Sequence, residues 1–483
     1  MALVLLLYIP IIGGHAKSLL TCAQWAQEQF GAVDLGDCRR GKRLVRVATA
    51  LAEFPSGTLP GAVLEWCELK AAYRLFDNPA VTFENILSPH WQNVQTTCSS
   101  SGQFLLIEDT TLLDYSSRKN LKGIGRIGDD GGQGINLHTT LALRVTGWDP
   151  VGEPHLALLG LAGQHRWVRA DELTRGEGVA PGRERKKRKF SRARESERWG
   201  KVLAQFPPAA AGNQRIYIAD REGDIYEAFQ RCRSAGFDFV LRACQDRALL
   251  QDQPSLFVTV AQQKELGRYP LQLRACPGTP AREATMAVRA TRVVLRPPYR
   301  PGGQLSPEEV FVVEAREVNP YHPEEPIHWL LLTTLDCLTY EQARRIVQLY
   351  ACRWIIEEYH KALKTGAGIE RTQLQERCRV EALLAILSLV AVRLLNLKLA
   401  AAESPDLPLS AQDVEPEDLC ILEARFGRPP GGWTKRNLWI CIARLGGFLA
   451  RRSDGLPGWQ TLWRGWNRLR AMSEGAQLMR RCG

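Results

Sequence analysis

The first regular pattern along the chain is helical. Between residues 21 and 78, apolar residues recur every three or four positions, which predicts amphipathic helices. Asp37 stands where it can cap a helix whose first turns are strongly basic: Arg39, Arg40, Lys42, Arg43 and Arg46. A shorter helix over AVLEWCELKAAYRLFDNP ends before Pro79. This density of positive charge favours contact with phosphates, and a solvated helix face is the alternative.

The pattern changes to strands in the middle of the chain. Buried-strand runs are FLLIEDTT, GINLHTTLALRV, EPHLALLGLAGQHRW and FDFVLRAC, and RIYIADREGDIYEAF is a strand followed by a turn and a helix. Short strands separated by Pro/Gly turns fill residues 246–328, before one more buried strand, IHWLLLTTLD. This part of the chain predicts an α/β core with a β-rich insertion. A basic tract at residues 183–194 is either a solvated loop or a segment that lies along a DNA backbone.

Helical spacing returns after Thr339. The run VEALLAILSLVAVRLLNLKLAAA is hydrophobic nearly all round, which predicts a core or interface helix. Its charged residues, Glu381 and Arg393, argue against a membrane span. Five tryptophans then predict a small helical module that buries aromatic side chains against itself or a partner chain: Trp433, Trp439, Trp459, Trp463 and Trp466.

Composition adds a basic character to this picture. The 483 residues carry a net charge of +11 and a pI near 9.1, which points to nucleic acid or an anionic membrane surface as the partner. The length predicts two to four domains. Thirteen cysteines without a CxxC pair predict reduced thiols, not a disulfide scaffold or a zinc site.

The first 20 residues form an apolar segment of their own. They mimic the core of a signal peptide, but they lack a positive n-region and are too short to span a bilayer. We interpret them as an extension outside the native fold, because the basic, cysteine-rich remainder is incompatible with export.

Three acidic residues stand at positions suited to metal chemistry. Asp109 ends one buried strand and Asp220 ends another; an acid there is most often a turn or cap residue, yet it is costly to bury unless paired or metal-bound. The third, Glu357, lies on a predicted helix with one face formed by Tyr350, Arg353, Glu357, Lys361 and Lys364. Either these residues form salt bridges on an exposed helix surface, or the Glu357 carboxylate is a functional group flanked by side chains that bind phosphate.

Carboxylates that converge without His or Cys suit Mg²⁺, which prefers oxygen ligands. Two such ions about 4 Å apart activate a water or a 3′-hydroxyl and stabilise the departing oxygen of a phosphodiester. Together with the basic helices, the three acids indicate cleavage and joining of DNA.

These residues lie in motifs that resemble those of bacterial cut-and-paste DDE transposases of the hairpin-forming, composite-transposon type. The segment YACRWIIEEYHKALKTGAG matches their Y-x2-R-x3-E-x6-K signature. Further matching motifs follow in order from about Trp25 to Trp466: LGDCRRGKRLVRVA, AAYRLFDNP, IEDTT, ADREGDI, IHWLLLTT, RLGGF and GWQTLW. The apolar N-terminus and the basic tract depart from the family pattern. The resemblance implies an RNase H-like catalytic core between N-terminal and C-terminal helical domains.

The resemblance also implies domain limits and roles for individual residues. The DNA-binding domain is expected at 21–85, the catalytic domain at 86–395 with its insertion at about 246–328, and a dimerisation region at 396–483. The implied metal-binding and catalytic triad is Asp109, Asp220 and Glu357, which would hold Mg²⁺, with Mn²⁺ as a substitute. The implied DNA-contacting residues are Arg43, Arg74, Arg242, Trp329, Tyr350, Arg353, Lys361 and Lys364. Trp329 would stack on a flipped base, and a buried core tryptophan is the alternative.

The family mechanism is implied in the same way. One strand is nicked, the freed 3′-hydroxyl attacks the opposite strand to form a hairpin, water opens the hairpin, and the 3′-hydroxyls attack target DNA. Double-stranded DNA with terminal inverted repeats is the expected partner, bound by a homodimer in a synaptic complex, in the cytoplasm of a bacterium, at the nucleoid and without a membrane. Two other classes stay open: an RNase H-fold nuclease or resolvase that does not join strands, and an inactive DNA-binding derivative.

Overall fold

In a computed structural model of the chain, the structure describes residues 21–55, 58–63, 65–128, 131–169, 195–250, 254–273, 280–300, 305–322, 324, 326–403, 406–409, 414–451, 454 and 457–482. The apolar segment 1–20 and the basic tract 183–194 lie outside these residues.

Helices form the N-terminal part of the chain, as the apolar spacing predicts. They are α1 (Cys22–Phe30), α2 (Cys38–Glu53), α3 (Leu59–Ala62), α4 (Trp66–Phe76) and α5 (Phe83–Cys98). The predicted cap is confirmed: the Asp37 side chain accepts a hydrogen bond from the backbone N–H of Arg39 at 2.9 Å. Apolar residues of α1, α2 and α4 pack into the main hydrophobic core, while Lys42 and Arg46 remain exposed on α2.

A large mixed sheet forms the centre of the molecule. Its strands are β1 (Gly102–Asp114), β2 (Gly125–Ile127), β3 (Gly132–Trp148), β4 (Pro154–Trp167), β5 (Asn213–Ala219), β6 (Asp238–Arg242), β7 (Gly267–Leu273), β8 (Arg282–Leu295), β9 (Glu308–Val318) and β10 (His328–Thr333). The strand order is β2-β3-β1-β5-β6-β10-β9-β8-β7, and β4 pairs with β3. Among the named strands of the described residues, parallel pairing is confined to β1–β5 and β5–β6. These strands correspond to the buried runs of the sequence, so the predicted α/β class is confirmed.

The β-rich stretch extends this sheet and does not fold as a separate one. Strands β7, β8 and β9 join it through β10, which pairs with β6. Short helices connect the strands: η2 (Glu195–Arg198), η3 (Lys201–Gln205), η4 (Arg221–Gly223), α7 (Tyr226–Ser234) and α8 (Leu256–Ala261).

The helix that carries the signature is interrupted. The chain forms α9 (Tyr340–Ala351), α10 (Trp354–Lys361), a π-helical turn η5 (Ala362–Gly366) and the 3-10 turn η6 (Ile369–Arg371). At the first break, the N–H of Arg353 bonds to the carbonyl of Tyr350, three residues back. The helical character predicted after Thr339 is confirmed, but the helix is interrupted, because tighter and wider turns replace α-helical spacing at the two ends of α10.

Helix α11 (Arg377–Glu403) is the predicted core helix, and its residues from 380 to 391 are buried all round. Among the described residues, no helix has both the length and the apolar character needed to cross a membrane. The remaining helices are α12 (Pro416–Phe426), α13 (Lys435–Leu445) and α14 (Trp459–Cys482). They share a small hydrophobic core of their own, against which Trp439 and Trp466 stack with ring centroids 6.5 Å apart.

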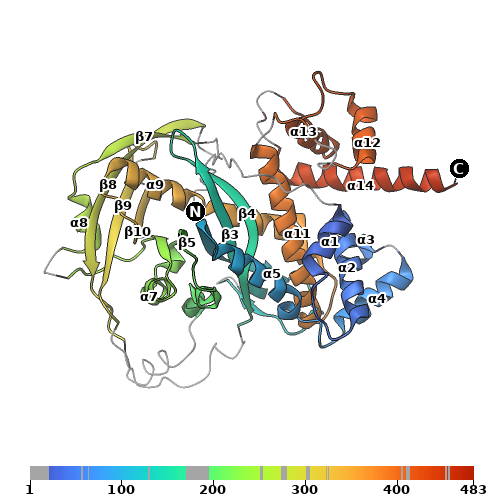
Figure 1. Cartoon of the computed structure of the whole chain (residues 1–483), viewed down its shortest axis with the longest axis horizontal. Helices are drawn as coiled ribbons and strands as arrows, with labels where there is room; N and C mark the ends of the chain where they lie inside the picture. Colours follow the sequence, from blue (N-terminus) through green and yellow to red (C-terminus); the bar gives the residue numbers. More distant parts are fainter. Residues whose placement is uncertain are drawn as a thin grey trace.

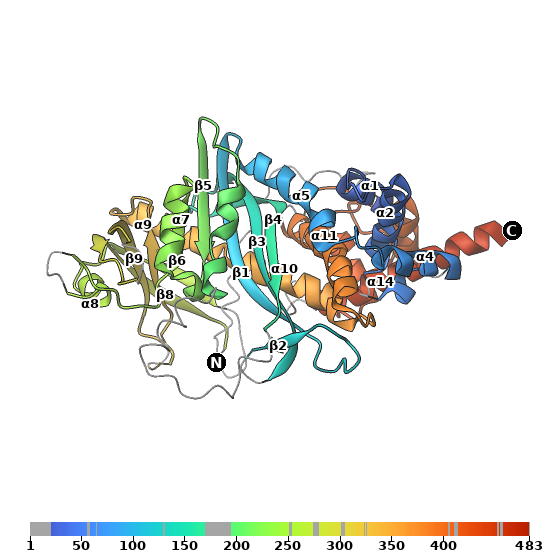
Figure 2. The ribbon, with the colours of Figure 1, turned by 90° about the horizontal axis from the view of Figure 1, so that it is seen from below.

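The sheet occupies one side of the molecule and the helical modules occupy the other (Figures 1 and 2). Helices α5 and α11 lie between them, and α14 reaches outward to the C-terminus. Of the predicted triad, Asp109 lies in β1, Asp220 directly follows β5, and Glu357 lies in α10, which packs beside β1.

Candidate active site

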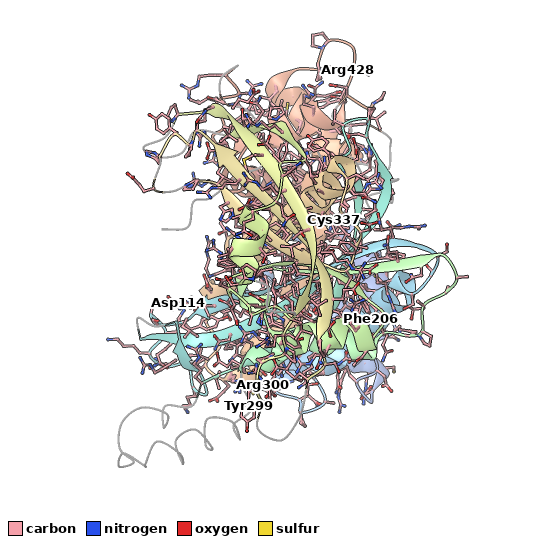
Figure 3. All side chains as sticks on the ribbon, turned by 90° about the vertical axis from the view of Figure 1, so that its left-hand side faces the viewer. Asp114, Phe206, Tyr299, Arg300, Cys337 and Arg428 are labelled. Atoms are coloured by element: carbon pink, nitrogen blue, oxygen red, sulfur yellow. The ribbon has the colours of Figure 1, made fainter. Side chains whose placement is uncertain are left out.

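Asp109 lies in β1 at the point where the parallel partner strand ends. The last paired residues of β1 and β5 are Glu108 and Ala219, so Asp109 and Asp220 come next on the two strands. Residues at the same level on neighbouring strands share one face of a sheet, and the two aspartates therefore emerge together. The expectation that Asp109 ends its strand is wrong, because the ladder with β3 carries β1 on to Asp114, near the edge of the molecule in Figure 3.

Asp220 follows the last residue of β5, as the sequence predicts. It caps the 3-10 turn η4, and its Oδ1 accepts the backbone N–H of Glu222 at 2.8 Å. A capping role and a metal-binding role are compatible here, because one N–H uses only part of the acceptor capacity of a carboxylate.

Glu357 comes to the same place from α10, which packs against β1. The Arg353 guanidinium lies between the two elements, 3.4 Å from Asp109 Oδ2 and 3.5 Å from Glu357 Oε1. One ligand atom from each of Asp109, Glu357 and His360 lies within 4.8 Å of the others. The structure thus brings two of the predicted acids together directly, and the sheet register places Asp220 beside them.

Charge crowding in this cluster is visible at Asp109. The pKa of its carboxyl is raised to about 8, first of all by burial and then by the negative charges of Asp220 and Glu357, while Arg353 acts in the opposite direction. Asp220 and Glu357 thus both act on Asp109. Arg353 supplies a single positive charge to the group, and its own pKa is raised by Tyr350 and by the three acids, against the effect of burial.

These residues fit a divalent cation. Carboxylate oxygens that repel one another in a buried cluster are the ligands that Mg²⁺ and Mn²⁺ use, and a bound cation would relieve the repulsion at Asp109. His360 adds a nitrogen: its side chain is buried, and its Nε2 has no hydrogen-bond partner among the described residues. His360 was not predicted from the sequence, although its position three residues after Glu357 places it on the same side of α10.

Three of the residues implied in DNA contact lie together beside the cluster and are mostly buried. Trp329 is 7% exposed and Tyr350 is 4% exposed, and their rings meet edge to face with centroids 5.2 Å apart. Arg242 donates to the backbone carbonyl of His328 at 2.9 Å, and burial lowers the pKa of its guanidinium. In this arrangement Trp329 packs in the core, and base stacking by this residue remains a prediction.

Lys364, the lysine of the signature, and Lys361, the further predicted phosphate contact, have different surroundings. Lys361 is exposed and pairs with Glu358 at 3.3 Å. Lys364, within the π-helical turn, donates to the carbonyl of Leu112 at 2.8 Å and pairs with Glu370 at 3.2 Å. Lys364 therefore connects the end of α10 to the strand that carries Asp109.

The predicted DNA-contacting arginines of the N-terminal helices have different surroundings. Arg43 forms an ion pair with Glu68, which joins α2 to α4. Arg74 is exposed in the last turn of α4. Arg74 is thus available to a phosphate, whereas Arg43 is also part of the packing between two helices.

A second polar group, which the sequence analysis missed, lies on the opposite face of β1. The buried carboxylate of Glu108 accepts hydrogen bonds from Tyr217 Oη (2.6 Å), Thr140 Oγ1 (2.8 Å), the N–H of Gly200 (2.8 Å) and His138 Nε2 (3.2 Å). Burial raises the pKa of Glu108, but these hydrogen bonds, first of all that from His138, lower it on balance. Glu108 is therefore a saturated acceptor inside the sheet and is distinct from the acidic cluster.

The mixed sheet, the flanking helices and the acids at its edge define an RNase H-like α/β protein. Two family models match the chain: transposase DNA-binding over residues 22–81, and transposase DDE domain over residues 191–393. The first match covers α1 to α4, and the second covers Asp220 and Glu357. The chain therefore carries the two domains of a DDE transposase, a DNA-binding enzyme class that depends on divalent metal.

Proposed function

We propose that this DDE transposase moves DNA by cut-and-paste transposition and uses Asp109, Asp220 and Glu357 as its three metal-binding carboxylates. The observation that carries the proposal is the convergence of these acids at the edge of β1 and β5, under α10. The intact set argues against an inactive derivative, which would be expected to lack at least one of them.

Divalent ions, Mg²⁺ or Mn²⁺, would be held by the three carboxylates and would supply activation of the attacking oxygen and stabilisation of the leaving oxygen. The chain itself provides the alignment. Asp109 is held by the Thr110 N–H at 2.7 Å and Asp220 by the Glu222 N–H, so their oxygens are oriented before substrate binds. Arg353 lies beside Asp109 and Glu357, where it can also pair with a phosphate oxygen of the DNA.

The finer mechanism is proposed from the signature residues. Nicking, hairpin formation, hairpin opening and strand transfer would follow in that order at terminal inverted repeats. Arg43 and Arg74 would contact the repeats, and Arg242, Trp329, Tyr350, Arg353, Lys361 and Lys364 would contact the DNA near the cleaved end. For Trp329 to stack on a base, its contact with Tyr350 would have to open, because only 7% of Trp329 is exposed.

A homodimer is part of the proposal, and α14 supports it. This helix reaches outward from the C-terminal module (Figure 1) and exposes 54% of Leu478 and 75% of Met479. Neighbouring exposed apolar side chains on a protruding helix are typical of an interaction surface. We further propose a cytoplasmic, nucleoid-associated location, in keeping with the DNA-binding domain.

The test is cleavage of a DNA fragment that carries the terminal inverted repeats flanking the gene, in Mg²⁺ or Mn²⁺. We expect hairpin-ended products from the wild type and none from Glu357→Gln, which removes the charge but keeps the side-chain size. Glu341→Gln is the matched control, since Glu341 is exposed in the first turn of α9 and lies outside the cluster, so its change leaves the triad intact.

Other outcomes separate the alternatives. Nicking without hairpins or joining would assign the chain to the nucleases and resolvases. Binding of the repeats without any cleavage by the wild type would assign it to inactive DNA-binding derivatives. Equal activity of wild type and Glu357→Gln would remove Glu357 from the site.

A further inference from the structure

The two aspartates of the site are each held by a backbone N–H from the residue one or two positions further on. Thr110 donates to Asp109 Oδ1 at 2.7 Å, and Glu222 donates to Asp220 Oδ1 at 2.8 Å. The positions of Thr110 and Glu222 therefore determine where the two carboxylates point.

One guanidinium contacts both of these residues. Arg198 Nε donates to Thr110 Oγ1 at 3.1 Å, and Arg198 Nη2 donates to Glu222 Oε2 at 3.1 Å. Its third nitrogen, Nη1, donates to the carbonyl of Glu195 at 2.7 Å. The Arg198 side chain, only 12% exposed, thus spans from β1 to the turn after β5.

Neighbouring rings hold this arginine in place. Its guanidinium lies 4.9 Å from the ring centroid of Trp167 and 5.6 Å from that of Trp199, both within cation–π range. Trp199 is buried and also packs edge to face against His138, with centroids 4.7 Å apart. A planar fork between aromatic rings has little freedom to move, so it is suited to fixing a distance.

The Thr110 hydroxyl connects this arginine to the buried group around Glu108. Because Thr110 Oγ1 accepts from Arg198, its own hydrogen is directed at His138 Nδ1, 2.9 Å away. His138 Nε2 in turn donates to Glu108. The contact between Arg198 and Thr110 is therefore anchored to the interior of the sheet.

We propose that Arg198 is a positioning residue that fixes the separation and orientation of Asp109 and Asp220, and so determines how tightly the site binds divalent cations. The inference rests on the proposed role of the two aspartates as metal ligands. Arg198 acts through the residues whose N–H groups hold these carboxylates, as partners of metal ligands commonly do.

Arg198→Lys tests the geometry separately from the charge. Lysine keeps the positive charge but cannot donate in two fixed directions at once. Arg231→Lys is the matched control, because Arg231 donates to the carbonyls of Glu197 and Trp199 on the same segment, at 2.8 Å each, without contacting Thr110 or Glu222. Mn²⁺ binding to the full-length, DNA-free proteins is measured by electron paramagnetic resonance, and binding to terminal-repeat DNA is measured in parallel without metal.

We expect Arg198→Lys to weaken Mn²⁺ binding by about ten- to a hundredfold while DNA binding stays at the wild-type level, and Arg231→Lys to match the wild type in both. DNA cleavage by the Arg198→Lys variant should recover as the Mn²⁺ concentration is raised. Wild-type Mn²⁺ affinity in Arg198→Lys would overturn the inference. Weakened DNA binding with unchanged Mn²⁺ affinity would also overturn it and would make Arg198 a phosphate contact.

A second pair of variants guards against misfolding of Arg198→Lys. Thr110→Val removes the hydroxyl at nearly constant volume, and Thr146→Val makes the same change on β3, where the hydroxyl of Thr146 donates to the carbonyl of His155 at 3.3 Å. Thr110→Val should lower Mn²⁺ affinity, and Thr110→Ser should restore it; equal Mn²⁺ affinity of the two valine variants would overturn the inference. A wild-type protein that neither binds Mn²⁺ nor cleaves DNA would instead refute the proposed function.

Discussion

At Asp109, burial and two neighbouring acids act against the negative charge that a metal ligand must carry. The metal-free protein therefore holds a destabilising group at the centre of its proposed site. Such a conflict between stability and chemistry is common where function requires charges to lie close together. Arg353 relieves it in part, by approaching Asp109 and Glu357 to 3.4 and 3.5 Å.

Asp109→Asn should stabilise the metal-free protein and abolish cleavage. With a pKa of about 8, the Asp109 carboxyl must take up a proton on folding at neutral pH, and asparagine avoids this cost because it is nearly the same size, still accepts the Thr110 N–H and carries no charge. We expect a rise in Tm of about 2–4 °C, or about 1 kcal/mol, measured by calorimetry in the presence of a chelator. Added Mn²⁺ should give the wild type the higher Tm of the two proteins, because Mn²⁺ stabilises the wild type alone. A lower Tm for the variant without metal would contradict the account of crowding at Asp109.

At the scale of elements, His90 on α5 joins the N-terminal helices to the sheet. Its Nε2 accepts the N–H of Leu161 in β4 at 3.1 Å, so the ring hydrogen is on Nδ1, which donates to Gln29 Oε1 of α1 at 2.9 Å. The fit is close at Gly160: its φ is +137°, and a Cβ there would lie 2.5 Å from His90 Nε2. Both the conformation and the contact require glycine at this position.

This junction should weaken in acid. Burial lowers the pKa of His90 to about 4, below the value of about 6.5 for an unfolded histidine. Between these values the unfolded chain binds the extra proton, so the stability contributed by His90 is complete above pH 6.5 and is lost as the pH falls towards 4. We expect urea denaturation to show a loss of about 2 kcal/mol from pH 7 to pH 5 that His90→Gln does not share. Equal pH dependence of the two proteins would show that His90 is not the titrating group.

The elements themselves were largely predictable from the sequence, whereas their limits were not. A run such as FLLIEDTT predicts a buried strand because its first residues are apolar without interruption. The run does not reveal that β3 continues to pair with β1 as far as Asp114. Likewise, three- and four-residue spacing predicts helix around Glu357 but does not reveal the break at Arg353 or the π-helical turn at Lys364. These features depend on tertiary packing.

Residues whose role depends on contacts with distant parts of the chain could not be recognised from the sequence. Arg198 follows the basic tract directly and looks like one more surface cation, and only the folded chain places it between Thr110 and Glu222. The position of His360 close to Asp109 likewise depends on the fold of the chain. By contrast, the three proposed ligands were found because each stands at the end of an apolar run or inside a signature with fixed spacing.

At the scale of the whole molecule, the sheet lies on one side, and the N-terminal and C-terminal helices lie on the other (Figure 2). The main hydrophobic core includes residues from α1 and α2 through the sheet to α11, whereas the C-terminal helices have a core of their own. Such a module can bury its outer surface against a second copy, and α14 also contacts η5, the π-helical turn that follows α10.

Met479→Glu should prevent pairing of DNA ends without impairing the binding of one end. A charge at this exposed position of α14 would be costly to bury in an interface. We expect paired-end complexes to fall at least tenfold in a gel-shift assay, and the mass from light scattering to stay at one chain per DNA end. Val151→Glu is the matched control, because Val151 is 72% exposed in the turn between β3 and β4, away from α14. A wild-type yield of paired ends from Met479→Glu would place the interface elsewhere.

The sheet order has a consequence for synthesis of the protein on the ribosome. Strand β6 ends at Arg242, whereas its neighbour β10 begins at His328. The two strands therefore cannot pair until the whole β-rich stretch between them has been translated. Glu357 emerges later still, after both aspartates. A nascent chain thus carries its DNA-binding domain from an early stage, while the last carboxylate of the proposed site arrives only when the sheet is complete.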